Sequence, residues 1–150
     1  MENRFAQLSS GWRTRIIPIV GDGNCFFRAV SRFLFRTQSH YRNIREIILR
    51  KTLRNPGIFR RMRETLGNDL HPIDILNRDG EYADIGVLFL CAHLFGIRIN
   101  LFRENNLVEP FMTFNTYDHV IPEFDDCLNL YFSGPETGGH FDLLNFGRPC

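Results

Sequence analysis

A single cysteine lies where the sequence changes from a polar turn to an apolar helix. Residues 22–28 read Asp-Gly-Asn-Cys-Phe-Phe-Arg, so Cys25 follows a flexible glycine turn and precedes an aromatic pair that can anchor a helix. Helix N-termini stabilise anions, which favours a thiolate at Cys25 and lets the loop amides face a developing oxyanion. The stretch therefore predicts a nucleophile, with Gly23 and Asn24 in the loop that forms the oxyanion hole.

A base for this nucleophile occurs near the other end of the chain. Residues 137–144 read Thr-Gly-Gly-His-Phe-Asp-Leu-Leu, which is typical of a glycine loop that runs into a strand. Side chains two apart on a strand share one face, so His140 and Asp142 point the same way while Phe141 enters the core. Asp142 could then orient the imidazole of His140, which completes a Cys-His-Asp set for nucleophilic catalysis.

Each of these residues also has a structural interpretation. Free cysteines are among the most buried residues, so we interpret Cys91, Cys127 and Cys150 as packing residues. Asp-Gly-Asn is a common turn sequence, and Asp22 could cap the helix or hold the loop amides through its carboxylate. A single histidine is more often hydrogen-bonded or on the surface than a general base. The combination of Cys25 with a His-x-Asp pattern favours catalysis.

Together the two segments resemble the ovarian-tumour (OTU) family of cysteine deubiquitinases. The family's first motif is Asp-Gly-x-Cys, then apolar residues and an Arg, and residues 22–28 match it. Its second motif is a His, an aromatic residue and Asp or Asn near the end of the domain, which residues 140–142 match. The middle differs: the chain has Tyr82, Ala83 and Val87 where the family often has Trp-Gly and a downstream Glu. This departure concerns subfamily and substrate preference, and it leaves the triad intact.

The resemblance implies acyl transfer to water on ubiquitin or polyubiquitin chains. A Cys25 thiolate, paired with protonated His140 and oriented by Asp142, would attack the carbonyl of the C-terminal glycine of ubiquitin. Amides of the loop 22–25 would hold the tetrahedral oxyanion. The resemblance also implies that Asp22 is needed for the architecture of the site, as support for the oxyanion loop or, less favoured, as the group that orients His140.

The ubiquitin tail ends in two glycines, so the resemblance implies a narrow cleft beside the nucleophile. Thr137, Gly138 and Gly139 precede the histidine and are expected to line this cleft. No metal or organic cofactor is required by the reaction.

The sequence leaves two other functions open. The same nucleophile could serve a thiol peptidase or transferase that acts on another ubiquitin-like modifier or on ordinary polypeptides. A domain with this fold could also bind ubiquitin chains without cutting them, although the intact Cys25, His140 and Asp142 argue against a silent module. An acidic set could face the basic surface of ubiquitin or simply form an exposed loop; it consists of Asp118, Glu123, Asp125 and Asp126.

Length and composition predict one domain over residues 1–150, acting as a monomer. A chain of 150 residues with 43% hydrophobic content can bury roughly 70% of its unfolded surface. The net charge of +1 exerts no overall attraction toward nucleic acid or acidic membranes, and we interpret the many arginines between residues 42 and 63 as solvated helix faces. The longest apolar run, 85–97, is shorter than the about 20 residues that a bilayer span needs.

The cysteines and the first residues predict a compartment. The four cysteines follow no metal or disulfide-framework spacing, and the polar opening of the chain, residues 1–4, predicts no secretory leader. We therefore expect a reducing cytosol, which would be the host cytosol if the source is a virus or a bacterium.

Hydrophobic periodicity predicts helices in the first two thirds of the chain and strands in the last third. Helices are expected over 25–35, 41–53, 58–66 and 82–95. Strands are expected over 15–20, as an edge strand whose pairing Pro18 limits, and over 97–102, 111–114, 128–132 and 140–146. This order predicts an α+β fold in which helices pack around a small, mainly antiparallel sheet. The OTU resemblance implies the papain-like version of that fold.

Overall fold

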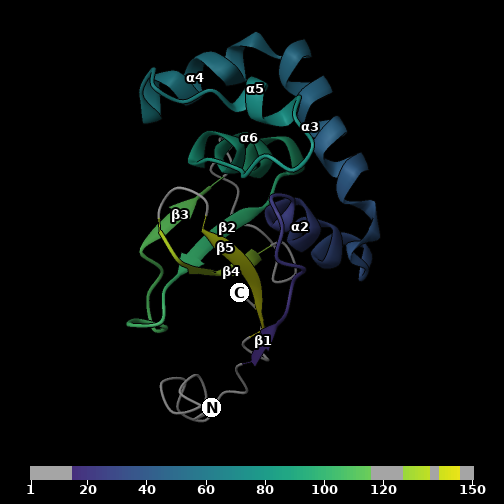
Figure 1. The fold of residues 1–150 in the computed structure, drawn as a ribbon. Coiled ribbons are helices and arrows are strands. Elements are labelled where there is room, and N and C mark those ends of the chain that lie inside the picture. The colour runs from purple at the N-terminus through teal and green to yellow at the C-terminus, as the bar shows by residue number, and fades with distance from the viewer. Residues whose placement is uncertain (1–14, 116–126, 136–138, 146–150) are drawn as a thin grey trace.

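The computed structural model describes residues 15–115, 127–135 and 139–145 (Figure 1). The elements in chain order are β1 (Arg15–Ile17), α2 (Cys25–Phe35), the 3₁₀ helix η1 (Gln38–His40), α3 (Tyr41–Arg54), α4 (Pro56–Leu66), α5 (Pro72–Leu76), α6 (Ile85–Phe95), β2 (Arg98–Phe102), β3 (Met112–Phe114), β4 (Cys127–Ser133) and β5 (His140–Asn145).

The strands form one sheet in the order β1-β5-β4-β2-β3. The β2–β4 pair is parallel, and the other three pairs in the described part of the chain are antiparallel. The predicted α+β fold with a mainly antiparallel sheet is therefore confirmed. β1 lies at the edge of the sheet and ends just before Pro18, which has no N–H to continue the ladder.

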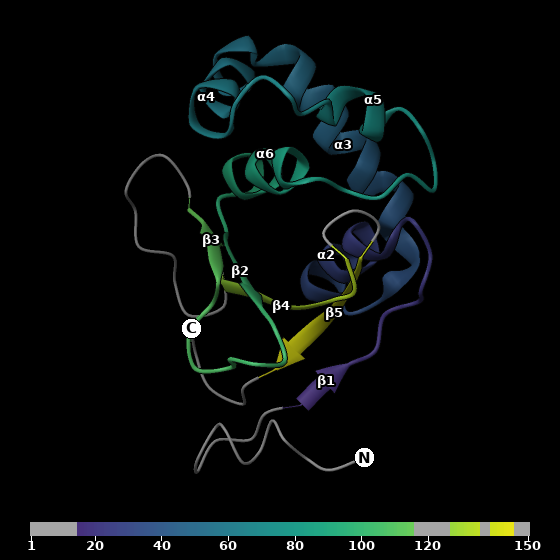
Figure 2. The same cartoon turned by 60° about the vertical axis from the view of Figure 1, so that its left-hand side comes forward.

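The helices form two layers over one face of the sheet (Figures 1 and 2). α2 and α6 pack next to the strands, and α3, α4 and α5 lie on the far side of α6. Every residue from 86 to 92 is buried, because α6 has the sheet on one side and the outer helices on the other. The main core also takes alternate residues of the central strands, such as Leu128 and Leu130 of β4.

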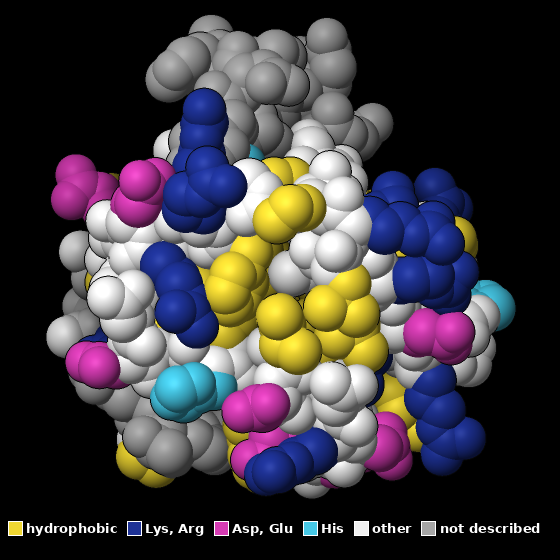
Figure 3. Space-filling model, turned by 90° about the horizontal axis from the view of Figure 1, so that it is seen from above, with side chains coloured by type: hydrophobic (Ala, Val, Ile, Leu, Met, Phe, Trp, Pro, Cys, Tyr) yellow, Lys and Arg dark blue, Asp and Glu magenta, His cyan; other side chains and the backbone are white. Residues whose placement is uncertain are grey.

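The outer layer explains the arginine-rich part of the sequence. Viewed from above, hydrophobic side chains gather in the middle of the face over the outer helices, and Lys and Arg side chains lie around them (Figure 3). Most basic residues of α3 and α4 are exposed, namely Arg42, Arg50, Lys51, Arg54, Arg60, Arg61 and Arg63. Arg45 is the exception among them, because only 5% of it is exposed. The predicted solvated face is wrong for Arg45.

Local hydrogen bonds explain where the helix boundaries differ from the prediction. α6 begins at Ile85 instead of Tyr82, because the Asp84 side chain accepts the Val87 N–H at 2.8 Å and caps the helix. α4 begins at Pro56, where a first-turn proline loses no helical hydrogen bond. The short α5 lies between the predicted helices 58–66 and 82–95, where the sequence predicts no helix.

Cys127 and Cys91 differ in oxidation state. Cys127 is disulfide-bonded, whereas the cysteine spacing predicts no framework; pairing depends on proximity in the fold, which spacing does not encode. Cys91 is a free, fully buried thiol inside α6, as predicted.

Among the described residues, no helix has the length and apolarity needed to cross a bilayer.

Candidate active site

The candidate nucleophile is the first residue of α2. The turn before it closes through the Cys25 N–H, which donates to the Asp22 carbonyl at 3.1 Å, and the Asn24 N–H, which donates to Asp22 Oδ1 at 3.0 Å. Phe26 and Phe27 follow and are completely buried, so they hold the first turn of α2 in the core. Cys25 itself is only 1% exposed.

The surroundings of this thiol oppose its ionisation. Burial raises the pKa of Cys25, and the carboxylates of Asp22 and Asp142 raise it further. The backbone N–H groups of Phe141 and Phe26 act in the opposite direction and do not outweigh burial. These surroundings favour the thiol over the thiolate that a helix N-terminus predicts. An attack by Cys25 needs a base.

The candidate base and its partner share one face of β5, as the sequence predicts. His140 Nε2 lies 2.7 Å from Asp142 Oδ1, while Phe141 between them points into the core and meets the Phe26 ring edge-on at 5.7 Å. Because Nε2 is engaged by the carboxylate, Nδ1 is the ring nitrogen that can exchange a proton with a thiol. Asp142 Oδ1 also accepts the Ile19 N–H at 2.9 Å, so the carboxylate is fixed from a second side.

The fold brings the two ends of the chain together at this point. The start of α2 packs against the start of β5, where the rings of Phe26 and Phe141 meet, and both the Phe141 N–H and the Asp142 carboxylate act on the pKa of Cys25. On the other side, a Cβ added to Gly21 would lie 3.9 Å from His140 Cε1, so the imidazole rests near the loop that leads to the nucleophile. Cys25, His140 and Asp142 thus form one site.

Asp22 has a different set of partners from Asp142. Its carboxylate accepts two hydrogen bonds from the Arg28 guanidinium, at 2.8 Å from Nη2 and 3.2 Å from Nε, and one from the Asn24 N–H. The hydrogen bond from Arg28 lowers the pKa of Asp22. The Arg28 guanidinium in turn stacks 3.9 Å from the centroid of the Tyr41 ring. Asp22 therefore closes the nucleophile loop, and Asp142 is the carboxylate that contacts the imidazole.

The two loop residues between Asp22 and Cys25 offer only their backbone to the site. A Cβ on Gly23 would lie 1.4 Å from the Gly80 carbonyl oxygen, so no side chain fits there. The Asn24 side chain is 4% exposed and bonds to groups behind the loop. The amides of Asn24 and Cys25 already donate to Asp22, so an oxyanion would have to share or replace these bonds.

A groove of about 520 Å³ adjoins the start of β5. Its walls come from the segment that leads into α6, from β2, β3 and β4, and from the start of β5; they include Tyr82, Ala83, Phe111, Phe132, Gly139 and Phe141. At Gly139 a Cβ would lie 2.4 Å from Phe132 Cζ and 2.6 Å from the Pro135 carbonyl oxygen. A side chain at this position would therefore collide with the groove wall.

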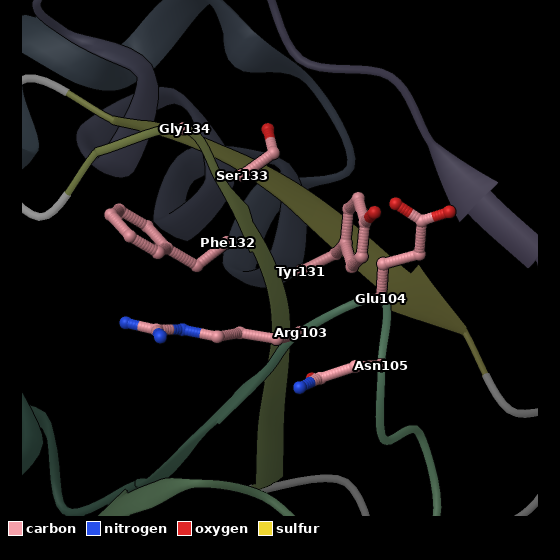
Figure 4. A pocket seen from close by; sticks show the side chains of 7 residues that line it. All are labelled: Arg103, Glu104, Asn105, Tyr131, Phe132, Ser133 and Gly134. Atoms are coloured by element: carbon pink, nitrogen blue, oxygen red, sulfur yellow. The ribbon is translucent and has the colours of Figure 1, made fainter.

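A second, smaller hollow lies over β4 (Figure 4). It has a volume of about 410 Å³ and is lined by Arg103, Glu104, Asn105, Tyr131, Phe132, Ser133 and Gly134. Tyr131 and Ser133 point to one side of the strand and Phe132 to the other (Figure 4). Ser133 pairs with His140 and Tyr131 with Asp142, so this hollow borders the candidate base.

Several predicted residues lie outside the described part of the chain. Of the three residues expected to line the cleft, Gly139 is on the groove wall, whereas Thr137 and Gly138 are not described. The acidic set of Asp118, Glu123, Asp125 and Asp126 is likewise outside the described residues.

Sequence reasoning missed two contributors to the site. The Ile19 donor is a backbone group, so no residue type could have indicated it. The buried Arg45 differs from its exposed neighbours only in its place in the fold, although its position beside Ile44 on the apolar side of α3 was a weak signal.

Comparisons with known proteins agree with this geometry. No protein-family profile matches the chain. Over 116 residues, 75% of the chain, it is 31% identical to "OVARIAN TUMOR DOMAIN-containing deubiquitinating enzyme 9" of Arabidopsis thaliana. Over 143 residues, 95% of the chain, it is 26% identical to the human "OTU domain-containing protein 1". The matches cover 32% and 28% of these relatives, so the chain spans about a third of their length.

Solved structures share the fold. The OTU domain of OTUD1 superposes with a TM-score of 0.66 at 22% identity, covering 88% of this chain and 85% of that one. The Hazara virus OTU bound to ubiquitin has a TM-score of 0.66 at 19% identity and covers 91% of this chain and 83% of that one. With the two sequence motifs, the site on α2 and β5 and the relatives above, the chain belongs to the ovarian-tumour (OTU) family.

Proposed function

We propose that this domain is a cysteine deubiquitinase that hydrolyses the peptide or isopeptide bond at the C-terminus of ubiquitin through a Cys25 thioester. The observation that carries the proposal is the Cys25 thiol at the start of α2 beside the His140–Asp142 pair. The name of the Arabidopsis relative and the Hazara virus OTU solved with ubiquitin support the choice of substrate.

The first half of the reaction forms the thioester. His140 Nδ1 takes the proton of the buried Cys25 thiol as sulfur attacks the carbonyl carbon of the terminal glycine. Loop amides stabilise the negative charge on the carbonyl oxygen. The imidazolium, held by Asp142, then gives its proton to the leaving amine, and the carbon–nitrogen bond breaks.

The second half releases ubiquitin. His140 removes a proton from water as the water oxygen attacks the thioester carbonyl. The carbon–sulfur bond then breaks, ubiquitin leaves with a free carboxylate, and the proton returns to Cys25. The cycle consumes one water and regenerates the thiol.

The groove beside β5 is suited to the tail of such a substrate. A tail that ends in two glycines needs a passage without protruding side chains, and Gly139 leaves its part of the wall bare. Tyr82 and Phe111 are 42% and 41% exposed and offer apolar surface to the residues before these glycines.

We also propose that the domain acts in the ubiquitin conjugation pathway of a reducing cytosol, because Cys25 must stay a thiol to act. The disulfide at Cys127 is an observation in the opposite direction, since disulfides are rare in the cytosol. Counting free thiols on protein isolated from cells tests this proposal: a free Cys127 thiol would agree with a reducing cytosol, and a disulfide at Cys127 would contradict it.

Intact-mass analysis with a ubiquitin that carries a C-terminal electrophile tests the function. We expect a covalent adduct on the wild type, none on Cys25→Ala, and an undiminished adduct on Cys91→Ala, which removes a buried thiol elsewhere. A protein that binds this ubiquitin without forming the adduct would instead be a silent binding module.

A further inference from the structure

Asn24, the residue before the nucleophile, turns its side chain into the protein. Its Oδ1 accepts from Arg45 Nη2 at 2.8 Å and from the Gly80 N–H at 3.2 Å. Its Nδ2 donates to Asp79 Oδ1 at 3.3 Å. Three hydrogen bonds therefore fasten the nucleophile loop to the protein interior.

The Arg45 guanidinium donates hydrogen bonds to groups that are distant from it in sequence. Nη1 donates to the carbonyls of Ile75 and Arg78, and Nη2 donates to the Glu81 carbonyl at 2.8 Å as well as to Asn24. The planar fork of a guanidinium has the fixed donor directions that such an arrangement needs, and an ammonium group does not. The segment between α5 and α6 is thus tied directly to the nucleophile loop.

This guanidinium also contacts the nucleophile helix. It lies 4.1 Å from the centroid of the Phe27 ring, two residues after Cys25. Burial lowers the pKa of Arg45, while the carboxylates of Asp79 and Glu81 raise it, and an arginine remains charged at neutral pH. A buried cation is costly unless its surroundings are fixed, so its place at this junction favours a specific geometric role.

The turn that Arg45 holds supports both the loop and the groove. Gly23 rests against the Gly80 backbone so closely that no Cβ fits between them. The Glu81 carbonyl, which Arg45 binds, immediately precedes Tyr82 on the groove wall. One side chain therefore sets the position of the nucleophile loop relative to the substrate groove.

We propose that Arg45 is a positioning residue for the reaction. Through Asn24 and the turn 78–81 it fixes Cys25 and the loop amides relative to His140 and the groove, while it contacts neither substrate nor reacting atoms. The inference rests on the proposed function for its substrate, but the placement of Cys25 beside its base is measurable without ubiquitin.

Three variants test this role with two readouts. Arg45→Lys keeps the charge and loses the fork, Asn24→Ala cuts the link to the loop, and Asn24→Asp restores an acceptor for Arg45. The first readout is the rate and half-saturation of Cys25 labelling by the electrophilic ubiquitin. The second is the pH dependence of Cys25 alkylation by iodoacetamide, followed by mass spectrometry.

We expect Arg45→Lys and Asn24→Ala to lower the maximal labelling rate by about 100-fold, with half-saturation changed by less than about twofold, because displacement of the loop misplaces the nucleophile. In these two variants the rate of Cys25 alkylation should rise only at higher pH than in the wild type, as we expect for His140→Ala. Asn24→Asp should recover part of the lost rate, because its carboxylate still accepts from Arg45 and the Gly80 N–H but replaces the donor to Asp79 with a like charge.

Ile48→Ala is the matched control, because it removes a fully buried side chain from the same helix. It should lower unfolding stability and leave both readouts of the folded protein unchanged. The proposal is overturned if Asn24→Ala matches the wild type, or if Ile48→Ala reproduces the shift in the pH profile. If Arg45→Lys fails to fold, the two Asn24 variants test the positioning role by the same two readouts.

Failure of the proposed function looks different from failure of this inference. If the wild type ignores the ubiquitin probe but the iodoacetamide profiles still separate the Asn24 variants, the substrate is wrong and the positioning role stands. If the wild type reacts with ubiquitin and the variants do so equally well, the substrate stands and the role of Arg45 is refuted.

Discussion

Burial of the Cys25 thiol determines how this residue responds to pH. A thiol with a raised pKa is protonated at neutral pH, and the reactive thiolate grows as pH rises. In the proposed mechanism His140 offsets this cost by accepting the thiol proton, so the base and the buried thiol would function as a unit. The carboxylate of Asp142, held by Ile19, keeps that ring in place.

We therefore predict that alkylation of Cys25 accelerates continuously from about pH 6 to about pH 9. His140→Ala should slow the reaction most at the lower end of this range, because the base is then missing. The measurement is the alkylation rate by mass spectrometry, with Cys91 as an internal buried thiol that should stay unlabelled. A rate that is already constant at acid pH would show a preformed thiolate and contradict the prediction.

At the scale of elements, glycines let backbone segments approach where the site is built. Gly23 permits the nucleophile loop to touch the turn at Gly80, and Gly139 permits the start of β5 to pass Phe132. In both places the obstructing atoms include backbone or a packed ring, so a side chain cannot be accommodated by a simple rotation.

Gly23→Ala and Gly139→Ala should each destabilise the fold by about 1–3 kcal/mol and reduce activity, because a Cβ forces these segments apart. Gly57→Ala is the matched control: nothing lies within 4 Å of its Cβ in α4, and alanine favours a helix by up to about 1 kcal/mol. Denaturant unfolding measures the three differences. Equal stability of Gly23→Ala and Gly57→Ala would be inconsistent with the close contact at Gly80.

At the scale of the whole molecule, one core connects the helical layers to the sheet. α6 is buried between the outer helices and the strands, and the main hydrophobic cluster includes residues of α2, α3, α4, α6 and the sheet. A shared core of this kind supports the prediction of a single domain, which so far rests on length and packing.

We expect a single cooperative unfolding transition. Far-UV circular dichroism should report the same midpoint as exposure of Cys91, which is fully buried in α6 and becomes reactive only when the layers separate. Loss of helical signal before Cys91 becomes accessible would show that α3–α5 unfold separately, and would contradict the single domain.

The residues of the candidate site were predictable, because their signals are local. Cys25 after a glycine turn and the His140–Asp142 alternation on a strand depend only on neighbouring positions. The same holds for most helices and strands, since hydrophobic periodicity follows from helix and strand geometry. The OTU motifs then indicated how the distant segments would meet.

Only the tertiary structure decided how these parts are held and tuned. The raised pKa of Cys25, the Ile19 hydrogen bond to Asp142 and the buried place of Arg45 all arise from contacts between segments far apart in sequence. Solvent exclusion and the direction of hydrogen bonds are properties of the packed chain. The sequence alone therefore determined which groups could react, and the fold decided the direction of their pKa shifts, their positions and the shape of the groove beside β5.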